Sequence, residues 1–253
     1  MVRYNITSGE IEELERVDES LLRRVLECPA ATPKEMLYLE LGVSPIRSII
    51  TSRRLNFLQY ILKENSDSMI HTFLMAQLSD STRLDWGQTV LKNKTEFSIS
   101  LSLQEIELMS EISFKALVHK KEISTTLRYL NKLKERHTKV MHISHNELKM
   151  ADYLTPNGIT NSEAKFLFNA RTRMLDVRSN FPGKHSDTLC PLCDDANDTQ
   201  EHLLMCMELA MAGTAVTNLP NYEELFEESL DAKVYISRLL KEKMSQRKKI
   251  LVS

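Results

Sequence analysis

The residues best suited to chemistry lie in one short segment, residues 190–206, which reads CPLCDDANDTQEHLLMC. This segment contains three of the chain's four cysteines and one of its seven histidines, at the spacing C-x2-C-x8-H-x3-C. Cys190 and Cys193 are three residues apart, so a tight turn can present both thiolates to one ion. His202 and Cys206 are four residues apart, so a helix would place them on one face. The segment therefore predicts a four-ligand metal site.

The donor set indicates which metal this site would hold and what the metal would do. Three sulfurs and one nitrogen suit Zn²⁺, and four protein ligands leave no position for a reactive water. We therefore expect a structural CCHC zinc finger rather than a catalytic ion. The loop DDANDTQE between the second cysteine and the histidine has no large apolar residue, so the metal itself should determine its fold. The alternative is that the cysteines are small buried residues beside an amphipathic helix.

The charge of the finger argues against direct contact between its loop and nucleic acid. The loop carries Asp194, Asp195, Asp198 and Glu201, with no Lys, Arg or aromatic residue, and such a surface repels phosphate. The stretch KFLFNARTRMLDVRSNFPGK just before it is basic instead. A run of cations on a helix can also be no more than a solvated face. The candidate nucleic-acid contacts in this stretch are Lys165, Arg171, Arg173, Arg178 and Lys184.

The net charge of −2 hides a strong asymmetry along the chain. Residues 115–184 contain 14 Lys and Arg against 6 Asp and Glu, and the tail 233–253 contains 7 against 1. Residues 185–232 contain 11 acidic residues and no Lys or Arg. Such blocks matter for binding partners more than the net value does. We therefore expect RNA or DNA as a partner.

Composition and helix signals predict an all-α fold. Only 6 of 253 residues are Gly and 7 are Pro, which favours helices with short connections. Thr7, Ser102 and Thr160 are each followed three residues later by Glu, the spacing of a capping box at a helix start. No alternating run is long enough for a sheet. We predict about ten helices in a helical region 1–136, a linker and basic helix 137–184, a zinc finger 185–213 and a helical tail 214–253.

Several classes of protein are not indicated. No apolar run approaches the roughly 20 residues that a membrane helix needs, so no membrane partner is expected. The N-terminus has no apolar signal segment, and the clustered cysteines suit a reducing compartment, so we expect an intracellular protein of the nucleus or cytoplasm. No phosphate-binding loop, nucleophile elbow or dinucleotide fingerprint is present, so neither catalytic residues nor a small-molecule substrate are predicted.

The finger and its approach resemble a known family. The run EAKFLFNARTRMLDVRSNFPGKHSDTLCPLCDDANDTQEHLLMC resembles the zinc-binding module near the C-terminus of non-LTR retrotransposon reverse transcriptases. There a basic helix precedes CPLC, an acidic loop and EHLLxC. The upstream runs YNITSGEIEELERVDESLLRRVLECP and TPKEMLYLELGVSPIRSIITSRRLNFLQYIL are similar to the segment after the polymerase core. The resemblance covers about residues 4–210.

The resemblance implies a role as well as a fold. It matches Cys190, Cys193, His202 and Cys206 to the family's zinc ligands, and Arg171 and Arg173 to the basic helix before them. The catalytic aspartates of the polymerase and the carboxylate cluster of the endonuclease have no counterpart here. We therefore expect a truncated, non-catalytic module that holds element RNA or target DNA, beside a separate polymerase-bearing chain if one is present. The alternative is a helical protein–protein interaction scaffold with a purely structural zinc.

Overall fold

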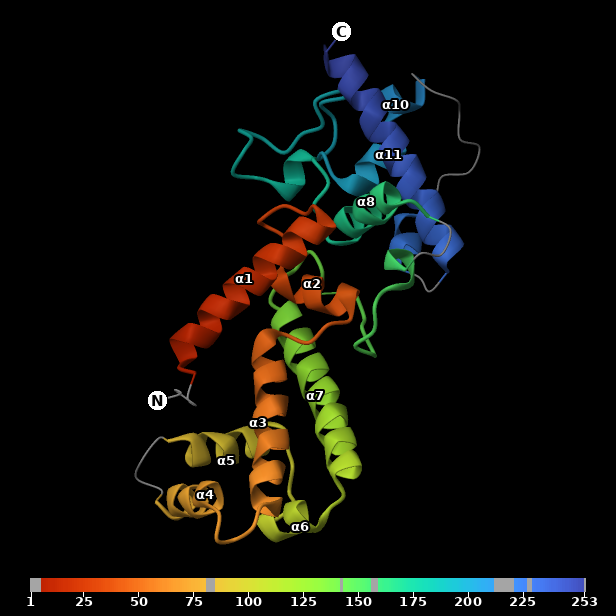
Figure 1. Cartoon of the computed structure of the whole chain (residues 1–253). Coiled ribbons are helices and arrows are strands. Elements are labelled where there is room, and N and C mark those ends of the chain that lie inside the picture. Colours follow the sequence, from red (N-terminus) through yellow and green to blue (C-terminus); the bar gives the residue numbers. More distant parts are fainter. Residues whose placement is uncertain are drawn as a thin grey trace. The chain divides into compact units, whose positions relative to one another are not determined.

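The computed structural model describes residues 6–80, 85–141, 143–155, 159–211, 221–226 and 229–252. Within these ranges the secondary structure is helical and no β-strand forms. The β pairing that occurs there is an isolated antiparallel bridge between Leu189 and Asn197. The predicted all-α fold is therefore confirmed (Figure 1).

In the first half of the chain the α-helices follow one another with short connections, as the low Gly and Pro content predicts, whereas the later connections, such as residues 135–160 and 172–199, are long. In chain order they are α1 (Ser8–Leu26), α2 (Lys34–Leu41), α3 (Ile46–Lys63), α4 (Met69–Ser79), α5 (Trp86–Glu96), α6 (Leu103–Leu108), α7 (Glu111–Lys134), α8 (Asn161–Arg171), α9 (Gln200–Met205), α10 (Met207–Met211) and α11 (Leu230–Val252). Three short 3-10 helices complete the described set: η1 (Asp152–Leu154), η2 (Arg178–Asn180) and η3 (Tyr222–Phe226).

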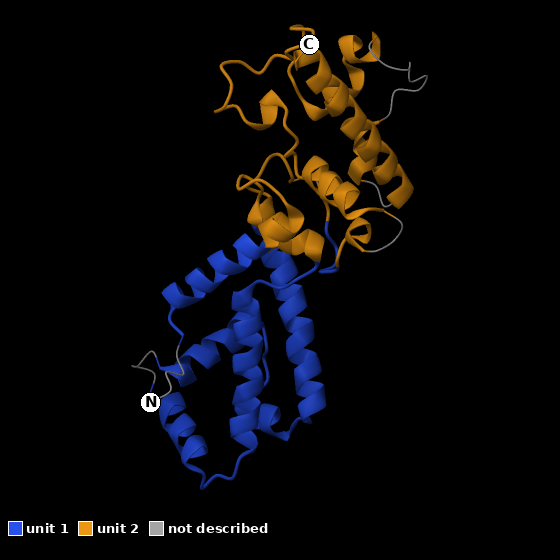
Figure 2. Cartoon of the chain, turned by 45° about the horizontal axis from the view of Figure 1, so that its top comes forward, with its two compact units in different colours: residues 1–21, 42–133, 145–149 blue, residues 22–41, 134–144, 150–253 orange. Residues whose placement is uncertain are grey.

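The chain forms two compact units that alternate along the sequence (Figure 2). Unit 1 contains residues 1–21, 42–133 and 145–149, and unit 2 contains residues 22–41, 134–144 and 150–253. This division differs from the consecutive segments expected from the sequence. Leu26 and Leu37 are the physical reason, because they are buried in the same core as residues of the metal-binding region. The expected start of the tail at residue 214 lies outside the described residues.

Unit 1 is built on the long helices α3 and α7, which run side by side (Figures 1 and 2). Thr126 of α7 donates a hydrogen bond to Ser48 of α3 at 2.9 Å, and Ser52 donates to the buried Glu122. The Gln59 side-chain amide of α3 donates a hydrogen bond to the backbone carbonyl of Ile106 in α6 at 2.9 Å. The core also takes apolar side chains from α4 and α5. Its fully buried members include Leu55, Leu58, Leu74, Val90, Ile106, Phe114 and Val118.

Unit 2 is built on α11, which packs against α8, α9 and η3. Its core draws buried apolar side chains from α1, α2, α8, α9, α10, η3 and α11. Cys190 and Cys206 belong to this core, so two of the four predicted metal ligands lie in the interior of the unit. The buried apolar members include Leu26, Leu37, Phe168, Leu203, Leu209, Leu225, Ile236 and Leu240.

The helix boundaries follow the caps expected from the sequence. The Ser102 and Thr160 side chains each accept a hydrogen bond from the backbone N–H three residues on, and each backbone N–H donates in return to the glutamate carboxylate at that position. Thr7 does the same with Glu10 at 3.3 Å and 2.7 Å. Gly42 follows α2 with φ of 65°, a left-handed conformation that glycine adopts without steric cost. Local rules therefore account for these ends.

Glu163, in the capping box of α8, should make the stability of unit 2 depend on pH. The backbone N–H of Thr160, followed by the Arg238 guanidinium at 2.7 Å, lowers the pKa of Glu163 from its ordinary 4.5 to about 2. A lowered folded pKa gives stability that is present above the unfolded value and is lost as the pH falls through about 2. Glu163→Ala should therefore be less stable than wild type near neutrality, and the difference should shrink between pH 4.5 and 2. Thermal unfolding at a series of pH values checks this, and a difference that does not change with pH would contradict it.

No helix among the described ranges combines the length and the apolar character that a membrane span requires.

Candidate metal centre

The first two ligands lie on a tight turn whose ends are closed by backbone hydrogen bonds. The Asp198 N–H donates to the Thr188 carbonyl at 2.7 Å, and the Cys190 N–H donates to the Ala196 carbonyl at 2.8 Å. At the tip, the Asp194 N–H donates to the Cys190 carbonyl at 2.9 Å. Asp194 has φ of 53°, so the chain reverses sharply just after Cys193. This turn places the thiols of Cys190 and Cys193 on the same side.

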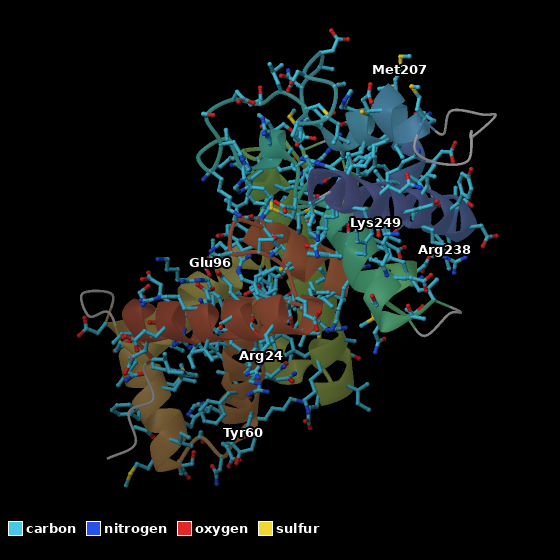
Figure 3. All side chains as sticks on the ribbon, turned by 90° about the horizontal axis from the view of Figure 1, so that it is seen from above. Arg24, Tyr60, Glu96, Met207, Arg238 and Lys249 are labelled. Carbon is cyan, nitrogen blue, oxygen red and sulfur yellow. The ribbon has the colours of Figure 1, made fainter. Side chains whose placement is uncertain are left out.

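The other two ligands come from α9 and its C-terminal end. Thr199 is the N-cap of α9, and its hydroxyl accepts a hydrogen bond from the His202 backbone N–H at 3.0 Å. The sequence predicts one helix with His202 and Cys206 on the same face, but α9 ends before Cys206. Cys206 is instead the C-cap, with φ −60° and ψ 118°, and α10 starts directly after it. Met207, in the first turn of α10, projects outward (Figure 3).

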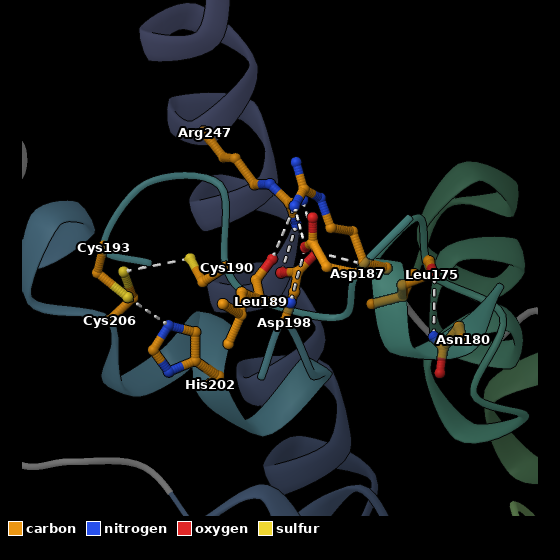
Figure 4. Close-up of polar contacts among 11 residues, drawn as sticks. Leu175, Asn180, Asp187, Leu189, Cys190, Cys193, Asp198, His202, Cys206 and Arg247 are labelled. Atoms are coloured by element: carbon orange, nitrogen blue, oxygen red, sulfur yellow. Dashed lines mark hydrogen bonds and ion pairs between the residues drawn. The ribbon is translucent and has the colours of Figure 1, made fainter. Parts of the chain in front are cut away.

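The four predicted ligands converge on one point (Figure 4). Each offers one ligand atom, and these atoms all lie within 4.8 Å of one another. The Cys190 and Cys206 sulfurs are 4.0 Å apart, and the Cys193 sulfur is 3.3 Å from Nε2 of His202. Cys190 and Cys206 are buried, whereas Cys193 and His202 are partly exposed. This Cys3His cluster can hold a metal ion, and its open side lies at Cys193 and His202.

The thiols of the cluster differ in their electrostatic surroundings. The backbone N–H of Asp195 lowers the pKa of the Cys193 thiol. Burial raises the pKa of the Cys206 thiol to about 11. A metal ion binds the thiolate, so binding at Cys206 must displace a proton that the protein interior retains. A cation at the centre of the cluster would compensate the buried thiolate charge.

Asp198 connects the metal-binding turn to the C-terminal helix. Its carboxylate is fully buried and forms a two-pronged ion pair with Arg247 of α11, at 2.9 Å and 2.7 Å (Figure 4). The same carboxylate accepts a hydrogen bond from the backbone N–H of Arg178 at 2.7 Å. The acidic loop sequence predicts that Asp198 lies on a phosphate-repelling surface, but its side chain is buried. The sequence could not identify Arg247 as its partner, because 49 residues separate the two.

Asp198→Asn should weaken metal binding without changing a ligand. The substitution removes the charge that fixes Arg247 and loosens the turn between Cys193 and His202. Loss of a group that orients ligands costs about 10-fold in metal affinity or more. Competition with a chromophoric chelator measures this, with Asp195→Asn as the control because Asp195 is an exposed acid of the same loop. Equal affinities for the two variants would contradict the role of Asp198.

Arg171 is not available for the nucleic-acid contact that the sequence predicts, because its side chain is buried. It is only 6% exposed, and its guanidinium pairs with the buried Glu40 carboxylate at 3.1 Å. It also donates to the Leu225 carbonyl and lies 5.6 Å from the ring centre of Tyr153. A buried arginine in this network is not accessible to a phosphate. The basic helix predicted by the sequence therefore directs this cation into the protein.

Three of the other four candidate contacts form ion pairs within unit 2. Arg178 pairs with Asp187 at 2.6 Å, and Lys165 pairs with Glu27 at 2.5 Å. Arg173 pairs with Glu201 and lies 4.4 Å from the ring centre of Tyr222. Lys184 is exposed and lies 4.7 Å from the ring centre of Phe181. Of the five residues, Lys184 keeps the most open position.

Searches against protein-family models, curated proteins and solved structures find no match to this chain.

Proposed function

We propose that this chain is a non-catalytic, nucleic-acid-associated module built around a structural zinc ion, and that it corresponds to the C-terminal region of a non-LTR retrotransposon reverse transcriptase. The observation that carries the proposal is the convergence of Cys190, Cys193, His202 and Cys206. These are the ligands of the CPLC and EHLLMC motifs on which the resemblance rests. A polymerase reaction would belong to another chain.

The geometry of the cluster supports zinc as the metal. Tetrahedral Zn²⁺, with sulfur at about 2.3 Å and nitrogen at about 2.05 Å, separates two sulfurs by about 3.8 Å and a sulfur from a nitrogen by about 3.6 Å. The corresponding separations here are 4.0 Å between Cys190 and Cys206, and 3.3 Å between Cys193 and His202. Four protein ligands complete the coordination of zinc, which supports a structural role.

The distribution of cations supports contact with nucleic acid away from Asp194 and Asp195, the exposed acidic residues of the finger loop. Unit 2 exposes Lys184 before the finger and Lys248 and Lys249 near the end of α11. The loop itself exposes Asp194 and Asp195. Phosphate contacts dominate affinity for nucleic acid, so the cationic part of the surface should bind and the acidic loop should face away.

Binding to labelled single-stranded RNA and DNA at two salt concentrations tests the proposal. Zinc-loaded protein should bind at low salt, and the logarithm of its association constant should fall linearly with the logarithm of salt concentration. Metal content is measured on the same sample. One equivalent of zinc with no binding to either nucleic acid at low salt would contradict the proposal.

A second candidate function, a helical protein-interaction scaffold, is favoured by one observation on α1. Leu14, Val17 and Leu21 share one face of this helix and are 44%, 59% and 56% exposed. Exposed apolar stripes of this kind are typical of protein-binding surfaces. The salt experiment separates the two candidates, because a protein-binding scaffold has no reason to bind nucleic acid in a salt-dependent way.

A further inference from the structure

A polar cavity of about 350 Å³ lies in unit 2, beside the helix that carries His202. It is bounded by the segment after α7, the end of α8, η2 and the start of α9. Every lining residue is polar or charged, which is unusual for a small-molecule pocket. The lining residues used below are Thr138, Lys139, Arg173, Ser179, Thr199 and Glu201.

Lys139 supplies the first cation of this cavity. Its ammonium donates to the Asn180 carbonyl at 2.5 Å and lies 6.0 Å from the ring centre of Phe181. Burial, together with the charge of Arg173, lowers the pKa of Lys139. Lys184 lies 4.7 Å from the centre of the same ring. In the described part of the chain neither ammonium forms an ion pair with a carboxylate. Two uncompensated cations therefore lie around one aromatic side chain.

Arg173 supplies the second cation of the lining and is held in an unusual conformation. Its φ is 60°, the left-handed region that side chains with a Cβ rarely adopt. The ring of Tyr222 at 4.4 Å and the carboxylate of Glu201 hold the guanidinium in place. This residue follows α8 in a C-terminal cap, in which the Met174 N–H donates to the Asn169 carbonyl at 2.8 Å. The cap and the two side-chain contacts fix the guanidinium beside the cavity.

We infer that this cavity is an anion site that takes a phosphate group of a nucleic-acid backbone. Lys139 and Arg173 provide charge, and the hydroxyls of Thr138 and Ser179 provide donors, which together match the oxygens of a phosphate. Glu201 is the one acidic residue of the lining and compensates a single cation. Lys184 can neutralise a neighbouring phosphate along the strand. The inference deepens the proposed function and rests on it for the source of the phosphate.

The test measures binding of a labelled single-stranded oligonucleotide to the zinc-loaded full chain over a range of salt. Lys139→Gln should weaken binding several-fold at low salt, and the slope of log association constant against log salt should become shallower by about 0.7, the value of one phosphate contact on a single strand. Glu201→Gln should tighten binding, because it removes the carboxylate that competes for Arg173. A gain of affinity cannot come from misfolding. Lys92→Gln, at an exposed lysine of α5, is the matched control.

The outcomes separate this inference from the proposed function. Wild type that binds, with Lys139→Gln and Glu201→Gln both unchanged, would overturn the cavity as the phosphate site and leave the proposed function standing. Wild type that binds no oligonucleotide at low salt would overturn the proposed function. In that case inorganic phosphate is titrated while the backbone NMR signals of Thr138 and Arg173 are followed. Saturable shifts would identify a free-phosphate site and overturn the nucleic-acid source, and no shifts would overturn the anion site itself.

Discussion

Cys206→Ser should abolish stoichiometric zinc binding and unfold the segment from Thr188 to the end of α9. Structural zinc contributes an apparent ~10–16 kcal/mol near neutral pH, whereas a whole domain has a net stability of about 5–15 kcal/mol. The turn at residues 188–198 contributes few buried apolar side chains to the core, so apart from the metal it is held mainly by the Asp198–Arg247 ion pair. α9 is better anchored, through Leu203 and Leu204. We therefore expect the turn to unfold first and α9 to follow.

Cys28→Ser is the matched control for this experiment. Cys28 is the remaining cysteine, lies outside the cluster and is partly buried. The variant should keep one equivalent of zinc and a melting temperature close to that of wild type. Amide hydrogen exchange locates the change, because protection should be lost at residues 188–206 in Cys206→Ser and retained in Cys28→Ser. Full zinc content together with unchanged protection in Cys206→Ser would contradict a structural metal at this position.

The local features of the fold were accessible from the sequence because each depends on neighbours in the chain. The capping boxes at Ser102 and Thr160 require only residues three apart. The metal cluster is also local, since a turn and one helix bring its four ligands together within residues 190–206. The break between α9 and α10 was missed because the apolar pattern runs through Cys206 without interruption. Coordination geometry, rather than helix periodicity, favours the bend at that residue.

The long-range contacts could not be predicted from the sequence, and they show that some of the basic residues are buried in ion pairs rather than exposed. The RTRM stretch predicts a cationic helix face, but Arg171 forms a buried ion pair with Glu40, which lies 131 residues away in the sequence. Arg247 likewise forms a buried ion pair with the distant Asp198. In both pairs the sequence shows two charges of opposite sign without showing that they are buried together. The interleaving of the two units has the same origin, because it follows from where Leu26 and Leu37 are buried.

Glu40→Gln should be strongly destabilising. Glu40 accepts from Arg171 at 3.1 Å and from the Tyr153 hydroxyl at 2.7 Å, in an interior where burial and the Glu40 charge raise the pKa of Tyr153. The substitution leaves a buried guanidinium without its counter-charge. Removing one partner of a buried ion pair costs about 3–5 kcal/mol. Denaturant unfolding of zinc-loaded protein measures the loss, and a change below about 1 kcal/mol, the range of surface pairs, would contradict it.

The same network decides how a loss of nucleic-acid binding in Arg171→Ala has to be interpreted. If Arg171 acts through the fold, then Arg171→Ala and Glu40→Gln should weaken binding in proportion to their loss of stability, although Glu40→Gln makes the protein more positive. If Arg171 contacts phosphate, only Arg171→Ala should weaken binding, and Glu40→Gln should strengthen it. The double variant Glu40→Gln/Arg171→Met removes both charges, so its destabilisation should be smaller than the sum of the single changes. We expect the first pattern, because the guanidinium is buried and its hydrogen bonds end on Glu40 and the Leu225 carbonyl.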